Sequence, residues 1–315
     1  MPGRPDPRPA RTTVLRTTVL RITAALTAAL AIGAALSACT GSSQDPAAGI
    51  RVVASTDVYG SLAETIGGAQ VTVTSIIDDP AKDPHEYQAD ARTQLAVSRA
   101  QLVIENGGGY DDFVDTMLSA SGNADVSVIN AVKLSGYDSS IPDFNEHVFY
   151  DIATVRKVVD AIVADYRTTD PSHAALFADR GAALQRKLAV LQQSELNLSG
   201  ATTGVGVAIT EPVPNYLLAA LGMKIVTPIA FSEAIDQGTD VSAVVLQQTL
   251  ATLSSGQAKL LVYNVQTGGP QTDAVLAAAK KAGIPAVPVS ETLPPGLDYV
   301  TWQKGVLATI AQALG

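Results

Sequence analysis

The feature that most constrains the fold is a stretch without a helix breaker in the middle of the chain. Residues 172 to 198 contain no proline and a single glycine, while Leu184, Leu188 and Leu191 recur at helical spacing. Asp170 and Pro171 just before it are a typical N-cap and first-turn proline. A helix of roughly 28 residues is about 42 Å long at 1.5 Å per residue. We therefore predict one long helix that can run from one lobe to another.

Short apolar strands alternate with helical segments on both sides of this helix. Such alternation favours a parallel sheet covered by helices, and it starts again after residue 200. We predict an α/β protein of two similar lobes, each a small, mostly parallel sheet flanked by helices, joined by one long rigid helix. The expected strands are 50–55, 71–77, 102–106 and 126–129 before the helix, and 204–210, 224–227, 260–263 and 286–289 after it.

The N-terminus has the pattern of a targeting signal. Five arginines precede an apolar run, Ile22 to Ala35, that is shorter than the roughly twenty residues of a bilayer span. Leu36-Ser37-Ala38-Cys39 follows and resembles a bacterial lipobox, and Cys39 is the only cysteine. We predict a signal peptide over 1–38, lipid attachment at Cys39 and a flexible tether over 39–48. The protein would then lie on the outer face of the cytoplasmic membrane, held by its lipid alone.

Removing this leader leaves an acidic chain. The leader holds five of the 21 basic and one of the 30 acidic residues, so 16 and 29 remain and the net charge is −13 over 277 residues. Such a charge repels nucleic acid and anionic lipid headgroups and is compatible with a cationic ligand. The length suits two lobes, which we expect over 49–166 and 200–315, with the connecting helix over 167–199.

Four side chains of metal-binding types stand where a loop leaves a strand or precedes a helix. His85, His147, Glu211 and Glu291 are separated by 62, 64 and 80 residues, so no local motif forces them together. Ligands of parallel sheets bind beyond the carboxyl ends of the strands, and imidazole with carboxylate donors suits a first-row divalent metal. Each residue alone has a plainer interpretation as a capping or solvated side chain. We give that interpretation to His173, in the first turn of the long helix.

Five segments together resemble one protein family. They are Asp83-Pro84-His85-Glu86-Tyr87, the strand and turn over 102–107, Glu146-His147-Val148-Phe149-Tyr150-Asp151, the segment 210–222 and Ser290-Glu291-Thr292-Leu293. This set is similar to segments of the metal-specific substrate-binding lipoproteins of ABC importers, the zinc and manganese receptors of the TroA, ZnuA and PsaA type. The resemblance covers the whole mature chain.

The resemblance implies that His85, His147, Glu211 and Glu291 are the metal ligands. The fourth position carries Glu291 where the family normally has Asp, one methylene shorter. Asp298 is the nearby competitor for that position, and we interpret it as the N-cap of the last helix.

The implied function is capture of a zinc or manganese ion between the lobes by a protein that is not an enzyme. A monomeric receptor of this kind delivers the ion to an ABC permease and its ATPase subunit. The sequence leaves the choice between zinc and manganese open. Alternatives are a receptor for a chelated metal or haem, and a secreted metallohydrolase, which would need an open coordination position and a positioned base.

Overall fold

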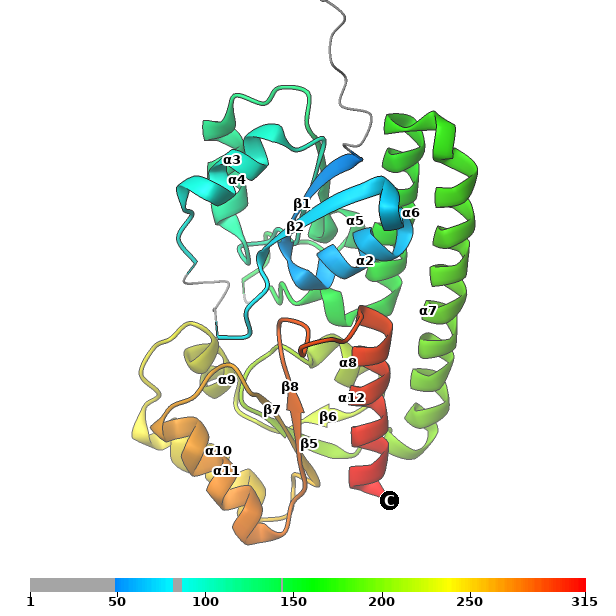
Figure 1. The fold of residues 1–315 in the computed structure, drawn as a ribbon. Coiled ribbons are helices and arrows are strands. Elements are labelled where there is room, and N and C mark those ends of the chain that lie inside the picture. Colours follow the sequence, from blue (N-terminus) through cyan, green and yellow to red (C-terminus); the bar gives the residue numbers. More distant parts are fainter. Residues whose placement is uncertain (1–48, 82–86, 143) are drawn as a thin grey trace, which may run out of the picture. The chain divides into compact units, whose positions relative to one another are not determined.

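The computed structural model describes residues 49–81, 87–142 and 144–315 of the chain. These residues contain two α/β lobes, and the long helix α7 (Ala174–Thr202) runs beside both of them (Figure 1). Helix α7 packs against helices of the first lobe and of the second. The helix predicted from the missing prolines is therefore present, with 29 residues.

The first lobe has a sheet of four parallel strands in the order β2-β1-β3-β4. Strand β1 is buried along most of its length, as expected for the inner strand of a parallel sheet covered on both faces. The elements of this lobe are β1 (Ile50–Thr56), α2 (Asp57–Gly67), η2 (Gly68–Gln70), β2 (Val71–Ile77), α3 (Ala91–Arg99), β3 (Leu102–Glu105), α4 (Asp112–Ser121), β4 (Ser127–Asn130), α5 (Ala131–Ser135), η4 (Val148–Tyr150) and α6 (Ile152–Thr169).

The second lobe repeats this plan with four parallel strands in the order β6-β5-β7-β8. The short turn η5 (Pro171–His173) precedes α7 and connects it to the first lobe. The elements after α7 are β5 (Gly206–Ile209), α8 (Asn215–Ala220), β6 (Lys224–Ile225), α9 (Ile229–Asp236), α10 (Ala243–Ser254), β7 (Leu260–Asn264), α11 (Pro270–Ala282), β8 (Ala286–Val289) and α12 (Tyr299–Leu314).

Two parallel sheets of matching strand order, flanked by helices and joined by a long helix, confirm the predicted fold class. The main differences are three. Strand β5 has four residues where seven were expected, and strand β6 has two where four were expected. Helix α9 lies in a stretch for which we predicted no helix. The lobe limits at residues 166 and 200 stay a prediction.

One hydrophobic core runs through both lobes. A single cluster of buried side chains includes Ile104 of β3, Leu188 of α7 and Val262 of β7. Two smaller clusters cover the other face of each sheet. Because the two lobes share buried apolar surface, separating them would expose it to water, which opposes a wide opening.

Three successive glycines, 107–109, lie in the turn that connects β3 to α4. Gly107 has a φ of +77°, and a Cβ there would lie 2.3 Å from Nδ2 of Asn130. The turn is held by Asp111, whose carboxylate accepts hydrogen bonds from the backbone N–H groups of Asn106 and Gly107. Both oxygens of the Asp111 carboxylate are used on this turn, so the residue has a structural role.

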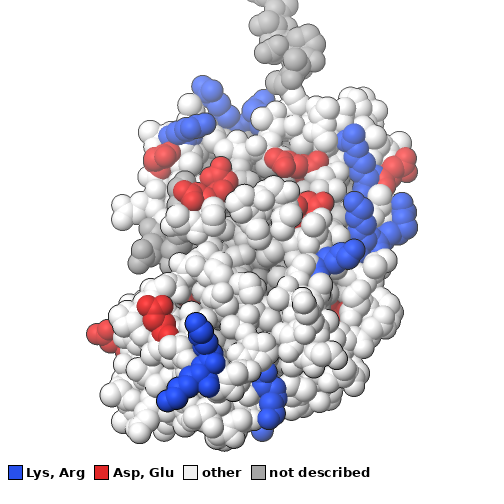
Figure 2. Space-filling view, turned by 60° about the horizontal axis from the view of Figure 1, so that its bottom comes forward, with Lys and Arg blue, Asp and Glu red and all other residues white. Residues whose placement is uncertain are grey.

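Charged side chains are scattered on the face shown in Figure 2, with no continuous basic stripe across it. Among the described residues no helix is both long enough and apolar enough to cross a bilayer.

Glu195 of α7 is a buried carboxyl group that we expect to weaken the fold at neutral pH. Burial, followed by the charge of Asp151, raises the pKa of Glu195 from 4.5 to about 7. The folded protein therefore binds the proton of Glu195 more tightly than the unfolded chain does. The stability that this protonated carboxyl group contributes is lost as the pH rises from 4.5 through about 7. Glu195→Gln should raise the free energy of unfolding at pH 8 by about 1–2 kcal/mol, after allowance for solvent screening.

Urea unfolding of metal-free protein at pH 4.5 and pH 8 measures this effect. The variant and the wild type should be nearly equal at pH 4.5 and differ at pH 8. Glu64→Gln, at an exposed position of α2, is the matched control and should change neither value. Equal stability of Glu195→Gln and wild type at pH 8 would contradict the argument.

Candidate metal centre

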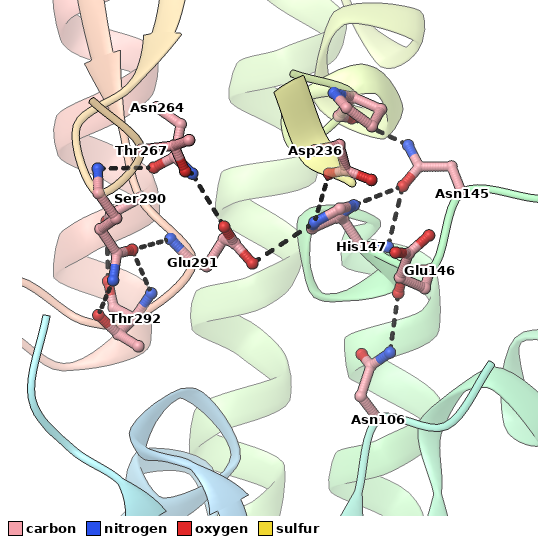
Figure 3. Close-up of polar contacts among 12 residues, drawn as sticks. Asn106, Asn145, Glu146, His147, Asp236, Asn264, Thr267, Ser290, Glu291 and Thr292 are labelled. Carbon is pink, nitrogen blue, oxygen red and sulfur yellow. Dashed lines mark hydrogen bonds and ion pairs between the residues drawn. The ribbon is translucent and has the colours of Figure 1, made fainter. Parts of the chain in front are cut away.

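The site lies where loops leave the carboxyl ends of strands, between segments from both lobes. Glu211 follows β5, Glu291 follows β8, and His147 directly precedes η4. All three side chains are buried. Figure 3 shows Glu291 and Asp236 approaching the ring of His147 from two sides.

The ring of His147 is held in one orientation by Asn145. Oδ1 of Asn145 accepts a hydrogen bond from the backbone N–H of His147 and lies 2.8 Å from Nδ1 of the same residue. Nδ2 of Asn145 donates to the carbonyl of Pro212, which fixes which end of the amide is the acceptor. The proton of a neutral ring is therefore on Nδ1, and the lone pair of Nε2 faces the carboxylates.

The segment before His147 is fastened to both lobes. Asn106, which follows β3, donates to the carbonyl of Glu146 at 2.9 Å. Tyr216 of α8 donates to the carbonyl of Asn145 at 2.7 Å. The rings of Tyr110 and Phe149 pack edge-on against the imidazole, with centroids 5.6 and 5.7 Å away. The imidazole is therefore fixed by its surroundings before any ligand arrives.

Nε2 of His147 lies 3.6 Å from Oε2 of Glu291 and 3.9 Å from Oδ1 of Asp236. These separations exceed the usual 2.7–3.2 Å of a hydrogen bond. Burial lowers the pKa of His147, but its interaction with Glu291, helped by Glu146 and Asp236, outweighs burial and raises the pKa to about 9. The carboxylates thus favour a positive charge at this place.

Glu291 is held at both its backbone and its side chain. Oε1 accepts a hydrogen bond from Nδ2 of Asn264, at the end of β7, at 2.8 Å. The backbone N–H donates to Oε1 of Gln266 at 2.5 Å. These contacts leave Oε2 directed toward His147.

Glu211 is 3% exposed, and its Oε2 has no hydrogen-bond partner among the described residues. Burial, followed by the charge of Glu291, raises the pKa of Glu211 to about 8. Asp236 contributes to the same effect. A buried group of carboxylates is costly unless a positive charge joins it.

Asp236 was not among the residues predicted from sequence. It is the last residue of α9, and its side chain is 13% exposed. Carbonyl groups at the end of a helix also favour a cation. One sequence signal could have indicated Asp236. Gln237-Gly238 is a typical helix C-terminus after a short apolar helix, and it places Asp236 at the end of that helix.

The predicted site residues have different outcomes. His147 and Glu291 face each other, and Glu211 interacts electrostatically with Glu291. His85 and Cys39 lie outside the described residues. Asp298 is the N-cap of α12, accepting a hydrogen bond from the backbone N–H of Thr301 at 2.7 Å, as predicted.

Within the described ranges, no three or more His, Cys, Asp or Glu side chains are gathered closely enough to enclose a metal ion. A cavity of about 720 Å³ is lined by Asp236 and by Asn145 and Glu146, which precede His147 in the chain. Its lining includes the acidic residues Glu146, Glu233 and Asp236, so it attracts cations. His173 makes a 2.6 Å contact with Asp170 at the start of α7, in keeping with the capping interpretation.

The sequence is similar to one protein family and to two curated proteins. The model of the family described as zinc-uptake complex component A, periplasmic (ZnuA), matches residues 52–313. The chain is 28% identical to the manganese-binding lipoprotein MntA of Halalkalibacterium halodurans over 158 residues, 49% of this chain and 51% of that protein. It is 29% identical to MntA of Bacillus subtilis over 133 residues, 41% of this chain and 43% of that protein. The chain spans about half the length of the curated relatives it matches.

Solved structures share the fold. A crystal structure of ZnuA has a TM-score of 0.70 at 18% identity and covers 85% of this chain and 100% of its own. The periplasmic zinc-binding protein TroA from Treponema pallidum gives 0.70 at 18% identity, over 84% of this chain and 98% of that one. FpvC from Pseudomonas aeruginosa in complex with Mn²⁺ has a TM-score of 0.68 at 20% identity and covers 84% of this chain and 98% of its own.

Glu211 should lower the stability of the metal-free protein. Its pKa of about 8 in the folded state lies above the ordinary 4.5. The stability that the protonated carboxyl group contributes to the fold is therefore lost as the pH rises from 4.5 through about 8. Glu211→Gln removes this buried charge and should raise the free energy of unfolding at pH 8.5 by about 1–3 kcal/mol. Urea unfolding of the metal-free proteins measures it.

The matched control is Glu233→Gln, which changes the same charge in the lining of the cavity. Glu233 is less enclosed than Glu211, so its substitution should change stability less. A Glu211→Gln variant that is less stable than wild type at pH 8.5 would contradict the argument.

Proposed function

Because this chain belongs to the family of the periplasmic zinc-uptake complex component A, we propose that it is the extracytoplasmic binding component of an ABC importer. It captures a divalent transition metal, zinc or manganese, between its two lobes. It then delivers the ion to a membrane permease driven by an ATPase subunit. The ion is cargo, so the site needs neither a nucleophile nor a general base.

The observation that carries the proposal is the approach of Glu291 and Asp236 to Nε2 of His147, at 3.6 and 3.9 Å. Two donors about 2.1 Å from one ion, at a near-tetrahedral angle, are about 3.4 Å apart. The observed separations are close to this value and longer than hydrogen bonds. Nε2 of His147 thus lies from each of these two oxygens at roughly the spacing of two donors to one ion.

The proposed ligands are His85, His147, Glu211 and Glu291. His147, Glu211 and Glu291 are supported by burial and by the electrostatic coupling among them. For His85 the support is the sequence resemblance alone. Asp236 adds a further carboxylate on the side of the cavity.

Zinc and manganese both fit these donors. Imidazole nitrogen suits zinc, which also binds most mixed sites more tightly than manganese does. Carboxylate oxygens suit manganese. Three carboxylate groups are present, those of Glu211, Glu291 and Asp236. The names of the matched relatives include both metals, with manganese in the two MntA lipoproteins and zinc in TroA.

Cys39 is the proposed lipid-attachment residue, after cleavage of residues 1–38. Lipid attachment would tether a monomer to the outer face of the membrane, close to the permease. The lipoprotein relatives support this location.

Metal titration of His147→Ala tests the proposed function. Metal-free protein from residue 40 onward is titrated with zinc and with manganese by calorimetry. Wild type should bind one ion with submicromolar affinity, and His147→Ala should weaken binding at least about 100-fold, because the variant lacks a ligand held in place by Asn145.

The chain offers a matched control in His173→Ala. This variant also removes one imidazole, but at an exposed position at the start of α7. It should bind like wild type. Failure of the wild type to bind zinc or manganese would overturn the proposal, and equal losses in both variants would remove His147 from the site.

Glu291 and Asp298 can be compared in the same titration. Glu291→Ala should weaken binding strongly because it removes a carboxylate that faces His147. Asp298→Ala should leave the affinity within about twofold and lower the free energy of unfolding by about 1 kcal/mol, since it removes the N-cap of α12. The opposite pattern would make Asp298 the fourth ligand.

A further inference from the structure

The side chain of Gln266 joins the Glu291 segment to the other lobe. Gln266 lies in the loop between β7 and α11 and is partly buried. Its Oε1 accepts hydrogen bonds from the backbone N–H groups of Glu291, at 2.5 Å, and Thr292, at 3.2 Å. Its Nε2 donates to Oγ1 of Thr292, at 3.1 Å, and to the carbonyl of Pro80, at 2.9 Å.

These four bonds use the whole hydrogen-bonding capacity of the amide, which has two donor hydrogens and two acceptor positions. The orientation of the amide is also determined. Backbone N–H groups can only donate, and the carbonyl of Pro80 can only accept, so Oε1 and Nε2 cannot be exchanged. Full satisfaction of its hydrogen bonds favours this one arrangement of the side chain, since any other would break several of them.

Pro80 belongs to the first lobe, in the segment that follows β2, and is 186 residues from Gln266. Glu291 belongs to the second lobe and faces His147. One planar amide thus fixes the backbone of Glu291 and connects it to the other lobe. Asn264 holds the carboxylate of the same residue from a second direction.

We propose that Gln266 is a positioning residue for the cargo, because it fixes Glu291 relative to the first lobe through its bond to Pro80. This inference rests on the proposed function. The bond to Pro80 stabilises the arrangement in which Glu291 faces His147, so it slows departure of the ion. Its loss acts chiefly on the dissociation rate of the metal.

The same region has other bonds between the lobes that do not depend on Gln266. The backbone N–H of Leu293 donates to Oδ1 of Asp57, at 3.0 Å, and the hydroxyl of Tyr150 donates to the carbonyl of Ser290, at 2.8 Å. These bonds keep the strand end in place when the amide is changed. The stability of the metal-free protein is therefore a separate readout from the retention of metal.

Gln266→Glu removes both bonds that the amide donates, to the carbonyl of Pro80 and to Oγ1 of Thr292, and Thr292→Val separates the second from the first. A glutamate keeps the oxygen that accepts from Glu291 and Thr292 but has no hydrogen to donate to the Pro80 carbonyl. Its added negative charge would attract a cation, so direct attraction to the ion would slow dissociation and not speed it. Gln266→Ala removes all four bonds, and Thr292→Val removes only the bond between the side chains of Gln266 and Thr292.

The measurement is the dissociation rate of zinc and of manganese into excess chelator by stopped flow, alongside the melting temperature of each metal-free variant. We expect about tenfold faster dissociation for Gln266→Glu, at least that for Gln266→Ala, and less than twofold for Thr292→Val. The metal-free melting temperatures of Gln266→Glu and wild type should agree within about 2 °C. With Co²⁺ as a probe, the visible spectrum of Gln266→Glu should differ from that of wild type.

Dissociation from Gln266→Glu at the wild-type rate, with an unchanged Co²⁺ spectrum, would overturn the inference and leave the proposed function intact. A wild type that binds no metal would overturn both. If Gln266→Ala does not fold, Gln266→Glu decides alone, because it retains the two bonds that hold the backbone of Glu291.

Discussion

Tyr150 donates a hydrogen bond from its buried hydroxyl to the carbonyl of Ser290, 2.8 Å away in the other lobe. Tyr299 donates in a similar way to the carbonyl of Phe149, at 2.7 Å. These tyrosines are part of the core that runs through both lobes. Ser290 adjoins Glu291 and Phe149 is two residues from His147, so the bonds that join the lobes also fix the segments that carry the candidate ligands. The geometry of the site therefore depends on this contact between the lobes.

The buried carboxyl groups make the proposed site a source of instability in the metal-free protein. Burial and mutual repulsion raise the pKa of Glu211 to about 8, so ionising it costs free energy in the folded protein. The pKa of His147 is raised because nearby carboxylates favour its charged form. A divalent cation satisfies the same carboxylates without protons. Proteins commonly carry such destabilising sites where binding requires them, and the large shared core provides the stability that tolerates this one.

Much of the fold could be predicted from periodicity, because strand and helix patterns repeat on either side of a stretch without prolines. Position at a strand end also led us to predict that Glu211 and Glu291 lie near each other, since parallel sheets gather such residues at one edge, and the structure has the two carboxyl groups electrostatically coupled. Asp236 was missed because α9 is short and its apolar residues do not identify its orientation. Asn145 and Gln266 were missed for a different reason. Their roles depend on hydrogen bonds to backbone groups distant in sequence, and no local pattern encodes these.

A core shared by both lobes restricts how an ion can enter and leave. Wide hinge opening would break the tyrosine bonds and expose apolar surface around α7 and α12, at a cost that grows with the area exposed. Gln266 and Asp236 are only partly buried and line the cavity that adjoins the site. Local rearrangement of the loops that leave the strands requires less free energy than separation of the lobes. Exchange of the ion should therefore depend on a few polar bonds in these loops, while the lobes keep His147 and Glu291 facing each other.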